Sequence, residues 1–213
     1  MTSPPEPIVL LGGGGHCHAC IDVVEAEGRF TIAGILDPAL TPGAQVLGYP
    51  VLGDDAEIPG LRDRQLAFLI TIGQIRSAQR RAALFAELSR LGGRLPVIVS
   101  PRAHLSRHAT VADGTILLHG AVVNAGAAIG ANAIINSLAL VEHDALVGSH
   151  CHIATGAIVN GGAVVEDGCL VGSGAVIREG VHIGAGSLVG AGVTVLRNLP
   201  AGSLVRAPPA PGG

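Results

Sequence analysis

The amino-acid sequence predicts a small α/β domain with a half-Rossmann-like parallel sheet, followed by a parallel β-helix built from six-residue repeats. Two observations carry this prediction. A branched aliphatic residue stands at every sixth position from Val111 to Val195 without a break. Ahead of that run, short apolar segments alternate with helix-like segments, and four glycines, 12–15, follow the first of them. A fixed short period is the signature of a solenoid, and alternating strands and helices indicate a parallel sheet.

The six-residue repeat assigns one short strand to each wall of the predicted β-helix. Branched residues fit a pleated strand, and the Gly or Asn that often stands three residues later tolerates the positive φ of a corner. Three walls make a coil of eighteen residues, so the fifteen repeats predict about five coils and a prism roughly 24 Å tall. The repeat positions are Val111, Leu117, Val123, Ile129, Ile135, Val141, Val147, Ile153, Val159, Val165, Val171, Ile177, Ile183, Val189 and Val195.

The position four residues after each repeat aliphatic is small for most of the run, because it must fit where two walls meet. Cys151 and Cys169 both occupy this position, eighteen residues apart. We therefore expect them to stack as buried thiols that act as small core residues.

The segment before the repeat predicts an N-terminal domain of residues 1–99, ahead of a β-helix domain of residues 100–206 and a C-terminal tail of residues 207–213. Its strands are expected over 8–11, 30–36, 66–72 and 95–99, and its helices over 16–27 and 75–91, the latter with Arg and Glu on one face. This alternation favours a small parallel sheet.

The glycine run between the first strand and the first helix predicts an anion site. Gly14, Gly15 and His16 stand where backbone N–H groups at a helix N-terminus meet phosphates or a sugar. Asp37 ends the second strand, where an acidic side chain binds ribose hydroxyls. Because the sheet is half the size of a dinucleotide fold, a mononucleotide or sugar nucleotide fits better. The segment 16–20, His-Cys-His-Ala-Cys, has no second ligand pair at zinc spacing, so no metal site is predicted.

A second candidate site lies in the repeat. His143 stands two residues after a repeat aliphatic, which places it at an outer corner, and Asp144 replaces the usual turn glycine. A carboxylate beside an imidazole fixes its tautomer and raises its basicity, so this pair predicts a general base. One coil later comes Gly161, whose N–H is an oxyanion donor in this interpretation. Among the other histidines, His104, His108 and His182 are interpreted as surface residues and His119 is left unassigned.

Composition excludes several other classes of protein. The net charge is −3, so no basic face for nucleic acid or anionic lipid is expected. No apolar run reaches the length of a membrane span, and no signal peptide is recognisable. Four cysteines in 213 residues are too few for a disulfide scaffold and fit a reducing cytoplasm.

The chain resembles the bacterial nucleotide-sugar acetyltransferases with hexapeptide repeats, which include the bacillosamine-pathway and perosamine N-acetyltransferases and the sialic acid O-acetyltransferases. The matching elements are Gly14-Gly15-His16, Leu36-Asp37, Gly48 to Gly53, Ile72-Gly73, Asn136, Glu142-His143-Asp144 and His152. The resemblance implies a left-handed β-helix, a homotrimer and an active site between neighbouring prisms. It also implies that the N-terminal domain holds the sugar nucleotide, with Gly73 and Asn136 among its contacts. Acetyl-CoA would lie along the prism against His152, Ser173 and Ala191.

These inferences predict direct acetyl transfer from acetyl-CoA to the amine of a nucleotide-linked amino sugar, of the GDP-perosamine or UDP-linked 4-amino type. No Cys or Ser is placed as a nucleophile, so no covalent intermediate is expected. O-acetylation of a sugar hydroxyl and a non-catalytic sugar-nucleotide-binding subunit remain alternatives. A γ-type carbonic anhydrase needs His-x4-His spacing for its zinc, and that spacing does not occur in the sequence.

Overall fold

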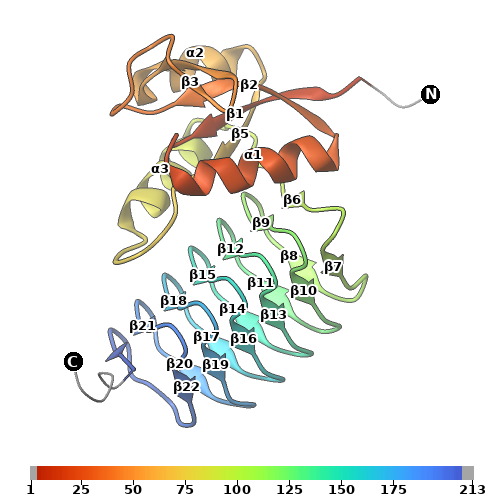
Figure 1. The fold of residues 1–213 in the computed structure, drawn as a ribbon, viewed down its shortest axis with the longest axis vertical. Coiled ribbons are helices and arrows are strands. Elements are labelled where there is room, and N and C mark those ends of the chain that lie inside the picture. Colours follow the sequence, from red (N-terminus) through yellow and green to blue (C-terminus); the bar gives the residue numbers. More distant parts are fainter. Residues whose placement is uncertain (1–3, 208–213) are drawn as a thin grey trace.

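A computed structural model describes residues 4–207 and shows two parts, an α/β domain seated on a triangular prism (Figure 1). The sheet of the α/β domain has the strand order β3-β4-β2-β1-β5 and is parallel apart from the β3–β4 pair. Its strands are β1 (Glu6–Leu11), β2 (Phe30–Leu36), β3 (Gln45–Val46), β4 (Tyr49–Gly53) and β5 (Ala67–Ile70). Its helices are α1 (Gly15–Glu27), the 3₁₀ turn η1 (Asp55–Glu57), α2 (Ile58–Asp63) and α3 (Gln79–Arg90).

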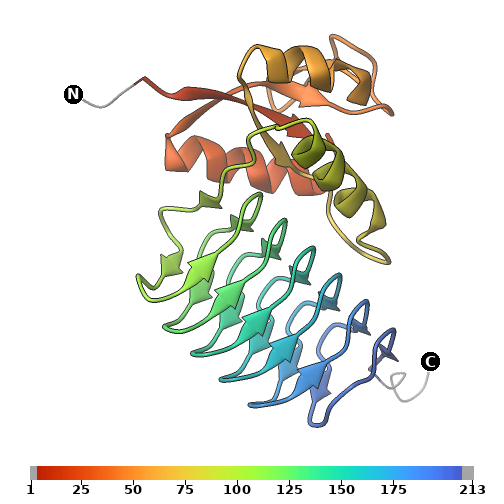
Figure 2. The same ribbon diagram turned by 180° about the vertical axis from the view of Figure 1, so that it is seen from behind.

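The sheet is covered on both faces, as alternation along its strands requires. Ile8 and Leu10 of β1 pack with α1 on the face toward the prism. Val9 and Leu11 pack with α2 and α3 on the opposite face. Figure 2 shows α2 and α3 from behind, with α1 between the sheet and the prism.

The prism is a left-handed parallel β-helix whose strands are two residues long. The first wall, which faces the α/β domain, has β6 (Ile98–Val99), β9 (Ile116–Leu117), β12 (Ile134–Ile135), β15 (His152–Ile153), β18 (Leu170–Val171), β21 (Leu188–Val189) and β23 (Leu204–Val205). The second wall has β7 (His104–Leu105), β10 (Val122–Val123), β13 (Leu140–Val141), β16 (Ile158–Val159), β19 (Val176–Ile177) and β22 (Thr194–Val195). The third wall has β8 (Thr110–Val111), β11 (Ala128–Ile129), β14 (Leu146–Val147), β17 (Val164–Val165) and β20 (His182–Ile183).

The register confirms the predicted repeat. Val123 pairs with Val141, and Val141 with Val159, which is a step of eighteen residues per coil. The repeat aliphatics point inward and form one continuous core. Cys151 and Cys169 are fully buried in it and lie on neighbouring coils, as expected.

Most corners of the prism turn at a glycine with positive φ, but four turn at other residues. These are Asn132, Leu138, Asp144 and His150, with φ of 53°, 60°, 59° and 60°. A side chain in this conformation costs energy that glycine avoids. Asp144 bonds to His143, as described below, and His150 Nδ1 lies 2.9 Å from Asn132 Nδ2.

Some predicted elements differ in the structure. Residues 95–99 do not form a fourth strand of the α/β sheet, because Ile98 and Val99 pair with β9 and start the prism. The expected helix 75–91 begins only at Gln79, after a loop. Both differences arise at the junction between the two parts, where contacts with the prism outweigh local propensity. Of the expected tail 207–213, all but Ala207 lies outside the described residues.

The two parts meet along α1 and the first wall. Cys17, Cys20 and Ile21 of α1 pack against the outward-facing Ile116 and Ile134 of that wall. At one end of this contact, His119 Nδ1 lies 2.5 Å from Ser100 Oγ and its Nε2 lies 2.7 Å from Asp22 Oδ2 of α1. Ser100 is only 1% exposed, so this Ser-His-Asp chain joins the two parts and offers no accessible nucleophile. Among the described helices, none combines the length and apolar character that a membrane span requires.

Candidate functional site

A cavity of about 670 Å³ lies at the carboxyl ends of β1, β2 and β5, and Asn136 and His152 of the prism also line it. Ligands of open α/β sheets bind at this edge. The six residues predicted to contact the substrate all line it, namely Gly14, Gly15, His16, Asp37, Gly73 and Asn136.

The glycine loop leaves the start of α1 open to the cavity. Gly14 is the N-cap of α1 and provides no side-chain cap; Cys17 N donates to Gly14 O, whereas the N–H groups of Gly15 and His16 have no acceptor among the described residues. Gly12 has φ of 108°, and a Cβ there would lie 2.5 Å from Ile72 Cγ1, so only glycine fits. The Asp37 carboxylate accepts hydrogen bonds from Gly13 N (2.7 Å) and Ala39 N (2.8 Å). Asp37 therefore shapes the loop, and its remaining lone pairs face the cavity.

A groove of about 320 Å³ continues from the cavity down the first wall. His152, Ser173 and Ala191, the residues assigned to the coenzyme by resemblance, all line it. Within residues 4–207, the amide N–H groups of Ser173 and Ala191 donate to no protein acceptor, so they present a line of donors along the groove. The cavity and the groove share four lining residues and so form one channel; these are Gln74, Ile75, Asn136 and His152.

Two histidines line the cavity close to its junction with the groove, and burial keeps both of them neutral. Burial lowers the pKa of His16 to about 3, assisted by the nearby His152 and Arg81. Burial also lowers the pKa of His152 to about 4, with Arg81 acting in the same direction. Their ring centroids are 6.1 Å apart, and His16 Nε2 is buried without a partner in the described part of the protein. This nitrogen is available to a ligand group in the cavity.

The predicted His143–Asp144 pair is present at the corner between the second and third walls. His143 Nδ1 lies 3.0 Å from Asp144 Oδ2, and both side chains are exposed. The hydrogen bond to Asp144 raises the pKa of His143, and the charges of Asp144, Glu142 and Glu179 add to it. Because Nδ1–H donates to Asp144, Nε2 carries the basic lone pair.

Gly161 lies one coil away, next to the Nε2 and Cε1 atoms of the His143 ring. A Cβ at Gly161 would lie 2.7 Å from His143 Nε2, which shows how close its backbone approaches the ring. No acceptor in residues 4–207 takes its N–H. The proposed oxyanion donor is therefore adjacent to the proposed base.

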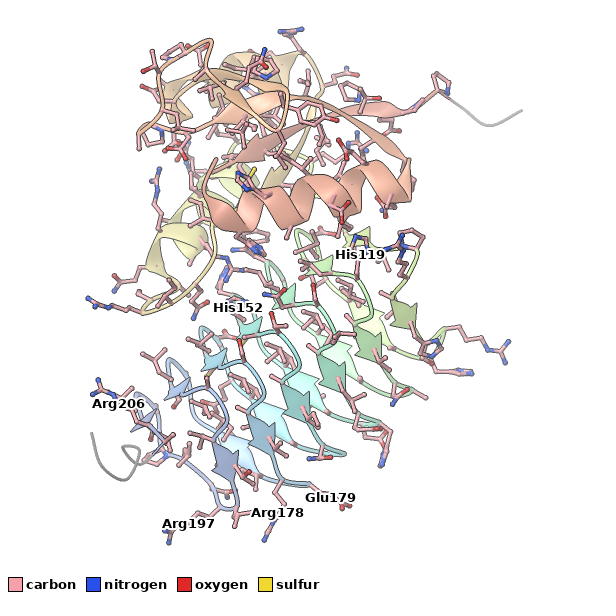
Figure 3. All side chains as sticks on the ribbon, viewed as in Figure 1. His119, His152, Arg178, Glu179, Arg197 and Arg206 are labelled. Carbon is pink, nitrogen blue, oxygen red and sulfur yellow. The ribbon has the colours of Figure 1, made fainter. Side chains whose placement is uncertain are left out.

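A single chain does not bring His143 to the channel. The corner that holds His143 joins the second and third walls, and in a triangular prism it lies opposite the first wall, which carries the groove. Figure 3 shows His152 on the side facing the α/β domain, and Glu179, in the corner column of His143, at the far edge. The two halves of the predicted site thus face away from each other.

The segment from His16 to Cys20 does not form a cluster of metal ligands. Cys17 and Cys20 are buried under the sheet, while His18 is exposed. Burial raises the pKa of Cys17 to about 11, which keeps the thiol protonated. In residues 4–207, no three His, Cys, Asp or Glu side chains gather as metal ligands would.

Comparison with known proteins gives matches for both parts of the chain. Residues 7–88 match the PglD N-terminal domain family, and residues 162–197 match the bacterial transferase hexapeptide family. No protein of curated function matches by sequence. A perosamine N-acetyltransferase variant from Caulobacter crescentus, solved with CoA and GDP-perosamine, is 34% identical, with 94% of this chain and 93% of that chain covered and a TM-score of 0.88.

The chain belongs to the bacterial nucleotide-sugar acetyltransferases with hexapeptide repeats.

Two further structures support this membership. The acetyltransferase domain of PglB from Neisseria gonorrhoeae, in complex with acetyl coenzyme A, is 28% identical with a TM-score of 0.89, and the match covers 95% of this chain and 97% of that one. WeeI from Acinetobacter baumannii is 25% identical with a TM-score of 0.83 and the same coverage. The resemblance inferred from sequence motifs is confirmed.

This acetyltransferase also has channel residues that sequence analysis missed. Gln74, Ile75, Asp55 and Arg80 line the cavity, the last two as an ion pair between η1 and α3. The sequence predicts a helix at residue 75, but Ile75 lies in a loop and is 83% exposed. The helix is predicted to carry Arg and Glu on one face, and Arg81, on that helix, is only 1% exposed. The sequence carries no signal for the burial of Arg81, because two of its three hydrogen-bond partners are the backbone oxygens of Asn132 and His150, far away in the chain.

Proposed function

We propose that the protein transfers the acetyl group of acetyl-CoA directly to the amine of a nucleotide-linked 4-amino-4,6-dideoxy sugar, of the GDP-perosamine type. The observation that carries this proposal is the continuous channel. A cavity with an anion-binding helix N-terminus meets a groove lined with free amide donors, and they join at Asn136 and His152. The 34%-identical neighbour, solved with CoA and GDP-perosamine, supports the same pair of ligands.

The parts of the channel suit the parts of the two substrates. The diphosphate would meet the N–H groups at Gly14 and Gly15, and the ribose would meet Asp37. The pantetheine arm would run past Ser173 and Ala191, where the backbone N–H groups are available. The sugar amine and the thioester would then meet beside His152.

The reaction needs a base for the proton that the amine loses as it attacks the thioester carbon. In this proposal His143 Nε2 takes that proton, and Asp144 stabilises the resulting imidazolium through its 3.0 Å contact with Nδ1. The Gly161 N–H faces the oxyanion of the tetrahedral intermediate, which collapses with loss of the CoA thiolate. General-base catalysis of this kind contributes about 10²–10⁴-fold.

His143 must come from a neighbouring subunit, because its corner is opposite the groove of its own chain. We propose a homotrimer with one site at each interface. The outward-facing residues of the second wall support it, since Val122, Leu140, Ile158 and Val176 form an apolar strip that is only partly covered in the single chain. Such a strip is typical of an oligomer interface. The four unpaired cysteines suit the cytoplasm, where acetyl-CoA is available.

The proposal is tested by incubating the protein with acetyl-CoA and a panel of GDP- and UDP-linked amino sugars, together with a matched sugar nucleotide that carries a hydroxyl instead of the amine. Release of CoA thiol is measured for each. Turnover of an amino sugar supports N-acetylation. Turnover of the hydroxyl analogue alone supports the O-acetyl alternative, and binding without turnover supports the non-catalytic one. His143→Asn is the variant control, expected to lose about 10²-fold or more in kcat.

A further inference from the structure

Arg81 is a buried cation at the junction of the two parts of the protein. Its guanidinium donates from Nη1 to Gln74 Oε1 (3.0 Å) and His150 O (3.4 Å), and from Nη2 to Asn132 O. Among the described residues no carboxylate forms an ion pair with it. Burial lowers its pKa to about 10, so it stays charged at neutral pH. A charge that is 1% exposed and held only by carbonyl oxygens is costly, which points to a use for it.

Gln74 is the residue that Arg81 orients. Its side-chain Nε2 donates to Gly168 O at 3.0 Å, at a corner of the prism. Because Gly168 O only accepts and Arg81 only donates, the two ends of the Gln74 amide are assigned without ambiguity. The side chain is therefore pinned at both ends, and with it the backbone of the loop that lines the channel.

The backbone oxygen of Gln74 fixes the tautomer of His152. It lies 3.1 Å from His152 Nδ1, and a carbonyl oxygen can only accept. Nδ1 therefore carries the proton, and Nε2 carries a lone pair. Asn136 Nδ2 lies 3.0 Å from Nε2, and Asn136 Oδ1 accepts from Ser137 N at 2.8 Å, so the amide donates to Nε2 as this tautomer requires.

We propose that Gln74 and Arg81 are positioning residues that hold His152 as a hydrogen-bond acceptor where the cavity meets the groove, and that an N–H donor of the bound ligand replaces Asn136 Nδ2 on the single lone pair of His152 Nε2. The donor's identity rests on the proposed function. Two donors reach this point there, the amine of the sugar and an amide of the pantetheine arm. The thioester carbonyl is an acceptor and cannot bond to this nitrogen, so His152 binds a donor and does not polarise the thioester.

The tautomer is measured directly by ¹⁵N NMR of histidine-labelled protein, with signals assigned by His152→Phe. We expect a protonated Nδ1 and an unprotonated Nε2 in the wild type at pH 7. Gln74→Ala removes the two side-chain anchors and should give a mixture of tautomers. Arg90→Met is the matched control on the exposed side of α3 and should match the wild type. A protonated Nε2 in the wild type, or an unchanged tautomer in Gln74→Ala, overturns the proposal.

Arg81 is tested by a pair of substitutions. Arg81→Met removes the cation, and Arg81→Lys keeps a charged donor at the same place. We expect Met to lower kcat about tenfold and to give mixed tautomers, and Lys to restore the Nδ1–H form and part of the rate. Equal loss in both variants with the wild-type tautomer retained assigns Arg81 a structural role only. If Arg81→Met does not fold, Gln74→Ala and Arg81→Lys decide the question.

The donor is identified by calorimetry with His152→Phe, titrated separately with CoA and with the GDP-linked amino sugar. A loss of about tenfold in affinity for CoA alone assigns the pantetheine amide, and a loss for the sugar nucleotide alone assigns the amine. No loss for either ligand refutes the acceptor role. The NMR result does not depend on turnover, so failure of the proposed function with every sugar leaves the tautomer assignment standing and is recognisable as a separate failure.

Discussion

Substituting Gly161 by alanine tests the role of His143 without touching either residue of the His-Asp pair. The new Cβ would lie 2.7 Å from His143 Nε2 and 2.8 Å from its Cε1. Ordinary contacts of a Cβ are 3.4–4 Å, so the ring must move by about 1 Å. The exposed ring has room to move outward, and Gly161 is outside the positive-φ region that alanine avoids. The fold should therefore tolerate the change.

The displacement removes the basic nitrogen from its position and strains its bond to Asp144. A misplacement of about 1 Å costs about 10²-fold in a positioned reaction, so we expect kcat to fall by about that factor while KM for both substrates changes little. The assay is CoA release with the best amino sugar, beside a thermal melt. Gly60→Ala is the matched control, because a Cβ there meets nothing within 4 Å. Wild-type kcat in Gly161→Ala, with the ring shown to have moved, would refute His143 as the base.

Three further outcomes follow from the site. Asp144→Asn removes the main cause of the raised pKa of His143. Because the proposed base is the neutral imidazole, the fall of kcat on acidification should move to lower pH, with a smaller loss at neutral pH than in His143→Asn; an unmoved pH profile assigns the acid limb to another group. Ala191→Trp fills the groove and should weaken CoA binding at least tenfold while sparing the sugar nucleotide, as two calorimetric titrations would show. Asp37→Ala should raise KM for the sugar nucleotide about tenfold and lower Tm, because Gly13 N and Ala39 N lose their acceptor; an equal rise in KM for acetyl-CoA contradicts the assignment of the cavity.

The prism was predictable because its sequence period is short and each six-residue repeat by itself indicates which side chain points inward. A branched residue at every sixth position indicates a short strand whose side chain points into the prism. The spacing alone therefore places Val141 and Val159 correctly in the core, one coil apart. The same logic placed His143 at a corner and Gly161 beside it. The junction was not predictable, because it depends on contacts between segments far apart in the chain. Ile98 pairs with the prism and not with the α/β sheet, and residue 75 lies in a loop before α3. Neither outcome can be predicted from the local sequence pattern.

The residues of the candidate site also fall into those that a local sequence motif predicts and those that depend on distant contacts. Residues that belong to a local motif, such as Gly14 or Asp37, could be named from sequence. Gln74 and Arg81 could not be named from sequence. Their side chains bond to the backbone carbonyls of Gly168, Asn132 and His150, and every residue type has such a carbonyl, so the sequence gives no signal for these contacts. An arginine on an otherwise amphipathic helix is usually solvated, so pattern analysis assigns it to the surface.

With His143 as the proposed base, the groove and the base of one active site come from two different subunits, because they lie on opposite sides of each prism. Two inactive variants can then complement each other. In a mixture of His143→Asn and Ala191→Trp chains, a site works when its groove comes from the first and its base from the second. With equal amounts and random assembly, about a quarter of the sites meet both conditions, whatever the number of subunits in a closed ring. A dimeric, trimeric or larger ring would regain the same fraction of wild-type activity, and a monomeric enzyme would regain none.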